Sequence, residues 1–400
     1  MNSIMKFYCR AFQFCFKMAI PILPYRNPRV LHSVSGVGKA LKKKGYDNVL
    51  IVTDKVIRDI EFFKKLEEGL KEHDIIYTVF DKTVPNPTIE NVEEAKGIYM
   101  EKGCQALVAI GGGSSIDCAK AVGARLVKKN QRVQKMAGIL KIHKKIPFLV
   151  AIPTTAGTGS EVTVTTVITD EVTKHKSPIS DFCLIPCLAV LDSDATKTLP
   201  EAIVATTGMD ALTHAVEAYI GNSTTKSTRA DAIEALNLIF ENLYKAYTDK
   251  SDEEARGRML KASFLAGRAF SKSYVGYCHA VAHSLGGEYN IPHGLANAVL
   301  LPYTLEEYGE SAHKKLCSLA KATGLCNDDA IDSEGAEAFI EKLKEMNKSM
   351  GIPDKLKGIK TEDIPRLAAY AAKEANPLYP VPRLMDAKEL EKLYHKVMED

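Results

Sequence analysis

The first half of the chain alternates short apolar runs with segments in which apolar residues recur at helical spacing. The apolar runs, several of them rich in β-branched residues, lie at 48–53, 75–80, 105–110 and 148–152. The helical segments lie at about 55–73, at 89–102 and from Ser114 onward. Strands that alternate with helices in this way are typical of a parallel sheet with helices on both faces. The pattern therefore predicts an α/β domain with a Rossmann-like sheet.

The pattern changes at about residue 200, beyond which no further strand is expected. Long Ala-rich and charged segments with apolar residues at helical spacing occupy 200–220, 226–247, 253–271, 312–323, 333–350 and 386–398. A chain of 400 residues exceeds the usual size of a single core, which also favours two domains. We expect an α/β nucleotide-binding domain over 1–198 and an all-helical, all-α C-terminal domain over 199–400.

The first 25 residues form an apolar and aromatic arm that Lys6, Arg10 and Lys17 divide into short pieces. This arm lacks the uninterrupted apolar core of an export signal, and no stretch of the chain reaches the ~20 apolar residues of a membrane span. We therefore interpret residues 1–25 as a helix or arm that packs on the protein or on a neighbouring subunit. This interpretation predicts a cytoplasmic protein with no membrane partner.

Composition narrows the function classes only slightly. The net charge of +3 is too small to indicate a nucleic-acid surface, so no nucleic-acid partner is expected. The nine cysteines include no C-x-x-C pair, which favours free thiols in a reducing compartment. Function must therefore be inferred from particular residues.

Two unusual loops follow predicted strands. The segment 109–117 (AIGGGSSID) contains three glycines that allow a close backbone approach, and it opens a helix whose amino end suits a pyrophosphate. The segment 153–161 (PTTAGTGSE) offers small hydroxyl groups after the next apolar run. The alternatives are a tight turn without a ligand and a flexible surface turn. Together the loops predict one cofactor site at the carboxyl ends of the strands.

Asp54 follows the strand predicted at 48–53. A carboxylate there can accept hydrogen bonds from a ribose hydroxyl and would repel a 2′-phosphate, which favours NAD over NADP. An equally open alternative is that Asp54 is the N-cap of the following helix.

The second half carries a candidate metal site. Asp210 and His214 are four residues apart in a predicted helix, and His279 and His283 repeat that spacing, so each pair shares a helix face. His293 follows in a Pro-His-Gly segment. A single histidine is more often a hydrogen-bonded structural residue, but two such pairs and a third segment favour a metal.

One carboxylate and three imidazoles suit Fe(II) or Zn(II), with a coordination position left open for substrate. Gly286 and Gly287 lie between His283 and His293, and we expect the chain to turn back at these glycines. Spacing leaves open which of His279 and His283 is a ligand.

Four stretches together resemble the iron-containing (group III) alcohol dehydrogenases. They are 111–117 (GGGSSID), 153–163 (PTTAGTGSEVT), 208–219 (GMDALTHAVEAY) and 279–294 (HAVAHSLGGEYNIPHG). A further stretch at 375–385 (ANPLYPVPRLM) resembles the butanol-dehydrogenase-like branch, and the resemblance runs from about residue 25 to the C-terminus. The aromatic arm exceeds the shorter start of many relatives, which leaves the oligomer contacts open.

The resemblance implies roles for individual residues. The metal ligands it implies are Asp210, His214, His279 and His293, with His283 at the nicotinamide or substrate end. The cofactor contacts it implies are Asp54, Asn86, Gly112, Gly113, Ser114, Asp117, Thr154, Thr155, Thr158, Ser160 and Lys176. The resemblance also strengthens the prediction that the protein prefers NAD to NADP, because NADP-preferring relatives tend to carry a small residue at the position of Asp54.

The implied activity is hydride transfer between NAD and a small primary alcohol or aldehyde, with Fe(II) or Zn(II). The surfaces of the helical domain and the N-terminal arm indicate a homodimer or higher homo-oligomer. Two alternatives are a polyol dehydrogenase and a dehydroquinate synthase-like lyase that releases phosphate. A third alternative is a non-catalytic protein that binds metal and nucleotide.

Overall fold

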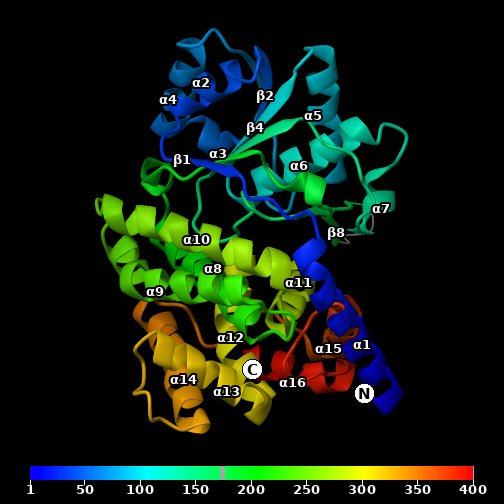
Figure 1. The fold of residues 1–400 in the computed structure, drawn as a ribbon, viewed down its shortest axis with the longest axis vertical. Helices are drawn as coiled ribbons and strands as arrows, with labels where there is room; N and C mark the ends of the chain where they lie inside the picture. The colour runs from blue at the N-terminus through cyan, green and yellow to red at the C-terminus, as the bar shows by residue number, and fades with distance from the viewer. Residues whose placement is uncertain (172–175, 400) are drawn as a thin grey trace. The chain divides into compact units, whose positions relative to one another are not determined.

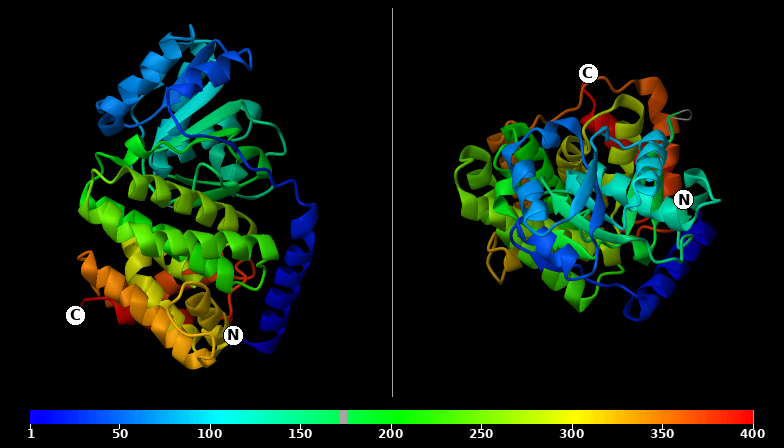
Figure 2. Two further views of the ribbon diagram at one scale, coloured as in Figure 1. Left: turned by 60° about the vertical axis from the view of Figure 1, so that its left-hand side comes forward. Right: turned by 90° about the horizontal axis from the view of Figure 1, so that it is seen from above.

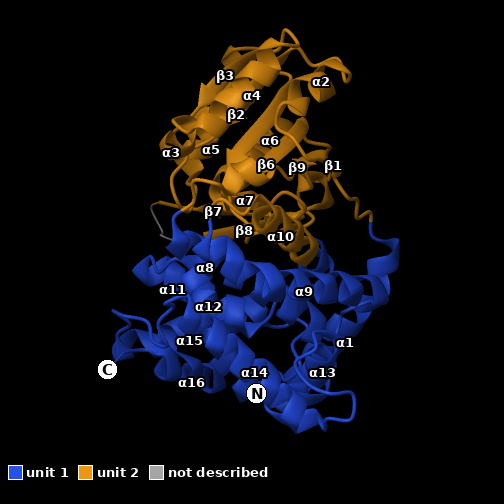
Figure 3. Ribbon diagram, turned by 90° about the vertical axis from the view of Figure 1, so that its left-hand side faces the viewer, with its two compact units in different colours: residues 1–23, 200–249, 268–400 blue, residues 24–199, 250–267 orange. Residues whose placement is uncertain are grey.

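The computed structural model describes residues 1–171 and 176–399 and divides into two compact units (Figure 3). The α/β unit contains Pro24–Leu199 and Lys250–Gly267, and the helical unit contains Met1–Leu23, Pro200–Asp249 and Arg268–Asp400. The division departs from a single boundary after residue 198 at two places. The N-terminal arm groups with the helical unit, and the first part of a long helix groups with the α/β unit.

The α/β unit is built on a parallel sheet (Figure 1), whose six strands have the order β1-β9-β6-β4-β2-β3. The strands are β1 (Arg29–Leu31), β2 (Asn48–Val52), β3 (Ile76–Phe80), β4 (Ala106–Gly111), β6 (Phe148–Pro153) and β9 (Leu188–Val190). The four predicted strands are thus confirmed, whereas β1 and β9 have three residues each and are too short to leave a readable pattern. All six residues of β4 are buried, as expected for a central parallel strand.

Alternate residues of β2 pack against helices on opposite faces of the sheet. Leu50 and Val52 join the core beneath α5 (Ile89–Glu101) and α6 (Gly113–Val127), while Val49 and Ile51 join the core beneath α2 (Gly36–Lys42) and α4 (Glu61–Lys71). The helix predicted at 55–73 is divided into α3 (Lys55–Arg58) and α4, because Ile60 adopts an extended conformation between them. The α/β unit also contains α7 (Val133–Met136).

A second, three-stranded sheet with strand order β5-β8-β7 completes this unit and was not predicted. Its strands are β5 (Gly138–Ile139), β7 (Thr165–Thr169) and β8 (Lys176–Ser180). β7 pairs antiparallel with β8, and the alternation of Thr, Val and Ile in β7 buries every second residue.

The helical unit contains no strand among its described residues (Figure 2). Its helices are α1 (Ser3–Ala19), α8 (Glu201–Ile220), α9 (Lys226–Thr248), the end of α10 (Glu253–Ser273), α11 (Tyr277–Tyr289), α12 (His293–Tyr308), α13 (Glu310–Ala322), α14 (Asp332–Ser349), α15 (Ile364–Ala375) and α16 (Ala387–Val397). None of the described helices is long and apolar enough to cross a membrane.

Helix α8 is the central helix of this unit, with 14 of its 20 residues buried. Gly208 allows the close approach of α9, since a methyl group at this position would lie 2.2 Å from Leu243 Cδ1. The tight α8–α9 contact holds α8 in place, and α8 carries the first two residues of the site described next.

Candidate metal centre and cofactor loops

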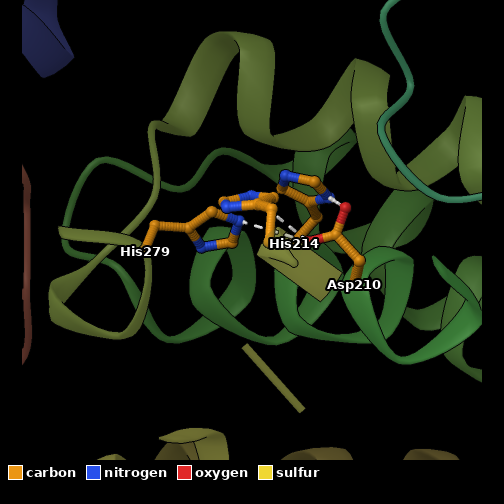
Figure 4. Close-up of side chains that lie close together, drawn as sticks. Asp210, His214 and His279 are labelled. Carbon is orange, nitrogen blue, oxygen red and sulfur yellow. Dashed lines mark ion pairs between the residues drawn. The ribbon is translucent and has the colours of Figure 1, made fainter. Parts of the chain in front are cut away.

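Three helices of the helical unit bring one aspartate and three histidines together. Asp210 and His214 lie one turn apart on α8, His279 lies in the first turn of α11, and His293 is the first residue of α12. One ligand atom from each of the four lies within 4.8 Å of the others. Asp210 Oδ1 is 3.9 Å from His279 Nε2 and 3.5 Å from His293 Nε2, and Figure 4 shows Asp210, His214 and His279 converging.

The four side chains have the chemistry that a divalent cation requires. His279 Nε2 is buried and has no hydrogen-bond partner among the described residues. Burial, together with the neighbouring imidazoles of His214 and His293, holds the pKa of His279 well below its ordinary value, so this ring is neutral and keeps a lone pair for a metal. A carboxylate with three imidazoles fits Fe(II) or Zn(II) equally well.

A buried carboxylate fixes the orientation of His279. His279 Nδ1 donates to Glu217 Oε2 over 2.6 Å, and Glu217 also accepts from the backbone N–H groups of Gly276 and Cys278 at 2.7 and 2.9 Å. Burial raises the pKa of Glu217 to about 7, although these N–H groups favour its ionised form. The carboxylate therefore sets the tautomer of His279 and turns Nε2 toward Asp210.

Two further contacts support the cluster. Asn297 Nδ2 donates to Asp210 Oδ1 over 2.7 Å and lies 3.1 Å from His293 Nε2. The ring of Phe270 stacks on His214 with centroids 4.1 Å apart. Glu217, Asn297 and Phe270 were not predicted from the sequence. A signal existed for two of them, because Glu217 lies two turns after Asp210 and Asn297 lies one turn after His293.

Replacing Glu217 by glutamine is expected to lower metal affinity about 10- to 100-fold, because the amide cannot hold the imidazole in one tautomer as firmly as the carboxylate does. Competition with a chelator of known affinity would measure this change. Glu241→Gln, at an exposed position of α9, is the matched control and should bind metal as the wild type does. Equal affinity in the two variants would show that Glu217 has only a packing role.

His283 lies outside the four-residue cluster. It follows His279 by one turn of α11, and its Nδ1 donates to Glu374 Oε1 over 2.7 Å. The hydroxyl of Tyr379 donates to the same oxygen over 2.7 Å, so Glu374 is held between the two side chains. The ring of His283 stacks on that of His293 with centroids 5.1 Å apart. His283 therefore lies beside the cluster, and its hydrogen bond to Glu374 fixes the orientation of its ring.

The turn expected at Gly286 and Gly287 from the sequence does not occur there. Both glycines lie inside α11, and Gly286 is buried. The turn occurs at Asn290, which adopts the left-handed conformation with φ 55° at the C-cap of α11. Asparagine tolerates this conformation better than most residues, and Pro292 then precedes the first residue of α12.

The two loops of the α/β unit lie side by side at the carboxyl ends of β4 and β6. Thr154 N donates to Gly111 O over 2.9 Å. A methyl group on Gly113 would lie 2.8 Å from Thr158 Cγ2, and one on Gly112 would lie 3.5 Å from Thr155 Cγ2. The distance at Gly113 is too short for a side chain, so the loops can approach this closely only with glycine there, whereas the distance at Gly112 is an ordinary van der Waals contact. Ser114 stands in the first turn of α6, whose amino end these loops surround.

Asp54 takes the position of a helix N-cap. Its Oδ1 accepts from the backbone N–H of Ile57 over 3.0 Å, as the alternative interpretation expected. Its Oδ2 lies on the side of the glycine loop, 3.5 Å from where a methyl group on Gly111 would be. The N-cap therefore leaves one oxygen directed toward the loop, and a role with a ribose hydroxyl stays a prediction.

Asn86 and Lys176, both expected near the cofactor, contact each other. Lys176 Nζ donates to Asn86 Oδ1 over 2.9 Å, and Asn86 adopts a left-handed conformation with φ 58° between two prolines. Their contact joins the loop after β3 to the start of β8.

Asp117 is held by β7. Its Oδ2 accepts from Val167 N over 2.8 Å, and its carbonyl accepts from Thr166 Oγ1 over 2.7 Å. Burial raises the pKa of Asp117 to about 6, against the influence of the nearby Lys120. This role ties α6 to the second sheet, whatever contact Asp117 makes with a cofactor.

A buried ionisable cluster lies behind the two loops. Lys120 Nζ donates to Thr163 O, Thr163 Oγ1 and Thr165 O, each over 2.9 Å, and burial lowers its pKa to about 8. Burial also raises the pKa of Glu161 to about 7, and Glu161 Oε2 has no hydrogen-bond partner among the described residues. Ionisation of Glu161 therefore lowers the stability of the folded protein.

Replacing Glu161 by glutamine is expected to stabilise the protein above pH 7. The carboxyl of Glu161 takes up a proton near pH 7 when folded but near its ordinary 4.5 when unfolded, so wild-type stability falls as the pH rises through this window. The gain should reach about 2–3 kcal/mol above pH 7 and vanish below pH 4.5. Urea unfolding from pH 4.5 to 8.5 measures it, with the exposed Glu68→Gln as control. A gain independent of pH would contradict the assignment.

Both units are similar to known proteins. Residues 31–193 match the family model described as iron-containing alcohol dehydrogenase, and residues 204–398 match that of the C-terminal part of the Fe-containing alcohol dehydrogenase family. Alcohol dehydrogenase 4 of Saccharomyces cerevisiae is 40% identical over 339 residues, which cover 84% of this chain and 87% of that protein.

Two further relatives match over most of their length. The NAD-dependent methanol dehydrogenase of Bacillus methanolicus is 37% identical over 342 residues, which cover 85% of this chain and 89% of that protein. The crystal structure of a 1,3-propanediol oxidoreductase superposes with a TM-score of 0.90 at 35% identity, covering 94% of this chain and 99% of that one.

Proposed function

Because this chain belongs to the iron-containing alcohol dehydrogenase family, we propose that it transfers a hydride between NAD and a small primary alcohol or aldehyde with the help of a divalent metal. The observation that carries the proposal is the convergence of Asp210, His214, His279 and His293, with ligand atoms within 4.8 Å of one another. These four residues would hold Fe(II) or Zn(II), and the bound ion supplies a Lewis acid toward a hydroxyl or carbonyl oxygen.

The residues around the cluster have distinct tasks in this scheme. Glu217 keeps His279 Nδ1 protonated, and Asn297 holds one oxygen of Asp210. His283, with Nδ1 fixed by Glu374, presents Nε2 as the group that accepts or returns the proton of the alcohol hydroxyl. Imidazole suits this task because Nε2 can take up a proton while Nδ1 keeps its hydrogen bond to the carboxylate.

In the α/β unit, the glycine loop and the amino end of α6 would bind the pyrophosphate of the cofactor through backbone N–H groups. Asp54 would accept from a ribose hydroxyl and exclude a 2′-phosphate, which favours NAD over NADP. The NAD-dependent methanol dehydrogenase among the relatives supports this preference. The further contacts proposed for the cofactor are those of Asn86, Asp117, Thr154, Thr155, Thr158, Ser160 and Lys176.

The substrate we propose is a primary alcohol or aldehyde of about four carbons, by resemblance to the butanol-dehydrogenase-like branch. A short diol is the second candidate, supported by the similarity to 1,3-propanediol oxidoreductase. We also propose that the protein is cytoplasmic and forms a homodimer or higher homo-oligomer.

Metal removal and restoration test the proposed chemistry. Protein purified without oxygen should oxidise NADH with butyraldehyde, lose at least ~100-fold of this activity after chelation, and recover it with Fe(II) or Zn(II). NADPH with butyraldehyde, and NAD with 1,3-propanediol, would be assayed in parallel. Activity that survives complete removal of the metal would contradict the proposal. Release of phosphate from a phosphorylated substrate without net change in NADH would instead favour the lyase.

A further inference from the structure

Helix α1 contacts the rest of the helical unit mainly through two polar side chains. Gln13 is buried and donates to the carbonyls of Pro377 and Tyr379 over 3.1 and 2.8 Å. Arg10 donates to the carbonyls of Val381 and Pro382 over 2.7 Å each. Cys9 is the one apolar residue of α1 that is buried in this contact. The helix is therefore held by hydrogen bonds to a loop and by the edge-to-face contact of Phe16 with Tyr274, whose ring centroids are 4.9 Å apart.

The opposite side of α1 is apolar and exposed. The side chains there include Ile4 (83% exposed), Phe7 (76%), Phe14 (63%) and Met18 (63%), and Ile22 (85%) extends the surface beyond the helix. Of the 17 large hydrophobic residues exposed in the described part of the chain, eight lie within residues 1–22. The other nine are scattered singly over both units.

The area of this surface matches one side of a protein interface. Ile4, Phe7, Phe14, Met18 and Ile22 expose on the order of 800 Å² together, more than the largest apolar patch of a typical monomer. A stable dimer buries about the same area, ~800 Å², on each partner. Exposure of this apolar area to water is unfavourable, and association that buries the area would recover the corresponding free energy.

The spacing of these residues along α1 is compatible with a second helix as the partner. Ile4, Phe7, Ala11, Phe14 and Met18 follow one another at intervals of three, four, three and four residues. Such alternation keeps one seam facing a second helix over the whole length of α1. Ala11 is small and central, with a phenylalanine on either side, so a crossing helix can approach closely at that point.

We infer that the apolar seam of α1 (Ile4, Phe7, Ala11, Phe14 and Met18) packs against the same seam of a second copy of this chain. A two-fold axis places a surface opposite itself, and no other described segment of similar length carries as many exposed large hydrophobic residues. With Ala11 on the axis of an antiparallel pair, Ile4 lies opposite Met18. The inference identifies a contact surface within the homo-oligomer proposed above and does not depend on the metal chemistry.

A lipid surface fits α1 less well than a second helix. Helices that lie on anionic membranes carry many Lys or Arg residues along the polar face. Arg10 is committed to backbone carbonyls of the same unit, which leaves only Lys6 and Lys17 for that task.

Cross-linking in the full chain tests the pairing directly. The Cys15→Ser background removes the exposed thiol of α1, and Ala11→Cys then places one thiol on the expected axis. Mild oxidation should give a covalent dimer at micromolar concentration, and adding Phe14→Glu should slow its formation at least ~100-fold, because the charge is buried twice in a two-fold interface. Tyr244→Glu, a comparably exposed aromatic position on α9, is the control and should leave the rate unchanged.

Three outcomes would overturn the inference. They are the absence of a cross-link in the Ala11→Cys variant, a cross-link that Phe14→Glu does not slow, and a wild-type chain that sediments as a monomer at all concentrations. Flotation with phosphatidylglycerol vesicles by a monomeric wild type, lost in Phe14→Glu, would assign the seam to a membrane instead. None of these readouts uses enzyme activity, so failure of the pairing and failure of the proposed chemistry are distinguishable.

Discussion

The His214→Ala variant is expected to lose its metal and its turnover together. His214 is buried on α8, its ring is stacked on Phe270, and its Nδ1 lies 4.0 Å from Asp210 Oδ2. Removing a residue that contacts the metal indirectly commonly costs 10- to 100-fold in affinity, so removing a ligand should cost at least ~1,000-fold. Elemental analysis of the purified variant, together with NADH oxidation on an aldehyde, measures both losses.

Two controls separate this effect from general damage. His395→Ala changes an exposed histidine on α16 and should retain both metal and activity. Circular dichroism and NADH binding should be unchanged in His214→Ala, because NADH binding is proposed for the other unit. A variant that turns over normally without metal would exclude the proposed role of the cluster.

The Asp54→Ser variant is expected to shift the preference between NADPH and NADH by about 100-fold toward NADPH. The substitution removes the charge that would repel a 2′-phosphate, and two like charges ~4 Å apart near a protein surface interact by several kcal/mol. Serine is also a good N-cap, so the hydrogen bond now made to Ile57 N can be kept. The ratio of kcat/KM for the two cofactors is the measurement.

Asp54→Ala completes this test, because alanine removes both the charge and the cap. The cofactor preference should shift as in Asp54→Ser, while the free energy of unfolding falls by about 1 kcal/mol more. If Asp54→Ser leaves the cofactor ratio unchanged, Asp54 serves α3 alone.

The sheet was predictable because its inner strands carry continuous apolar runs that alternate with helical segments. The last four residues of β2 and all six of β4 are buried, as is typical of a parallel sheet covered on both faces. β1 and β9 were not predictable, since three residues carry no period and their pairing depends on partners distant in the sequence. The break between α3 and α4 was not predicted, because Asp59 and Ile60 do not interrupt the helical pattern.

The site shows the same limit. Spacing of four residues indicated His279 and His283 equally, because both lie on one face of α11. The structure separates them through residues far along the chain, since Glu217 holds His279 and Glu374 holds His283. Such partners depend on the packing of α8 and α15 against α11, which no local pattern encodes. The turn at Asn290 was misplaced because glycines usually mark turns, whereas here they lie within a helix.

The left-handed turn at Asn290 would make the resistance of the protein to proteolysis depend on a bound metal ion. It joins α11 and α12, each of which gives the cluster one histidine, while α8 gives the other two groups. An ion held by all three helices would oppose local opening of this turn, and its binding energy would add to the cooperativity of the unit. When the ion is scarce, this turn would open more often and become accessible to proteases. Iron or zinc availability would then govern the abundance of the protein as well as its rate.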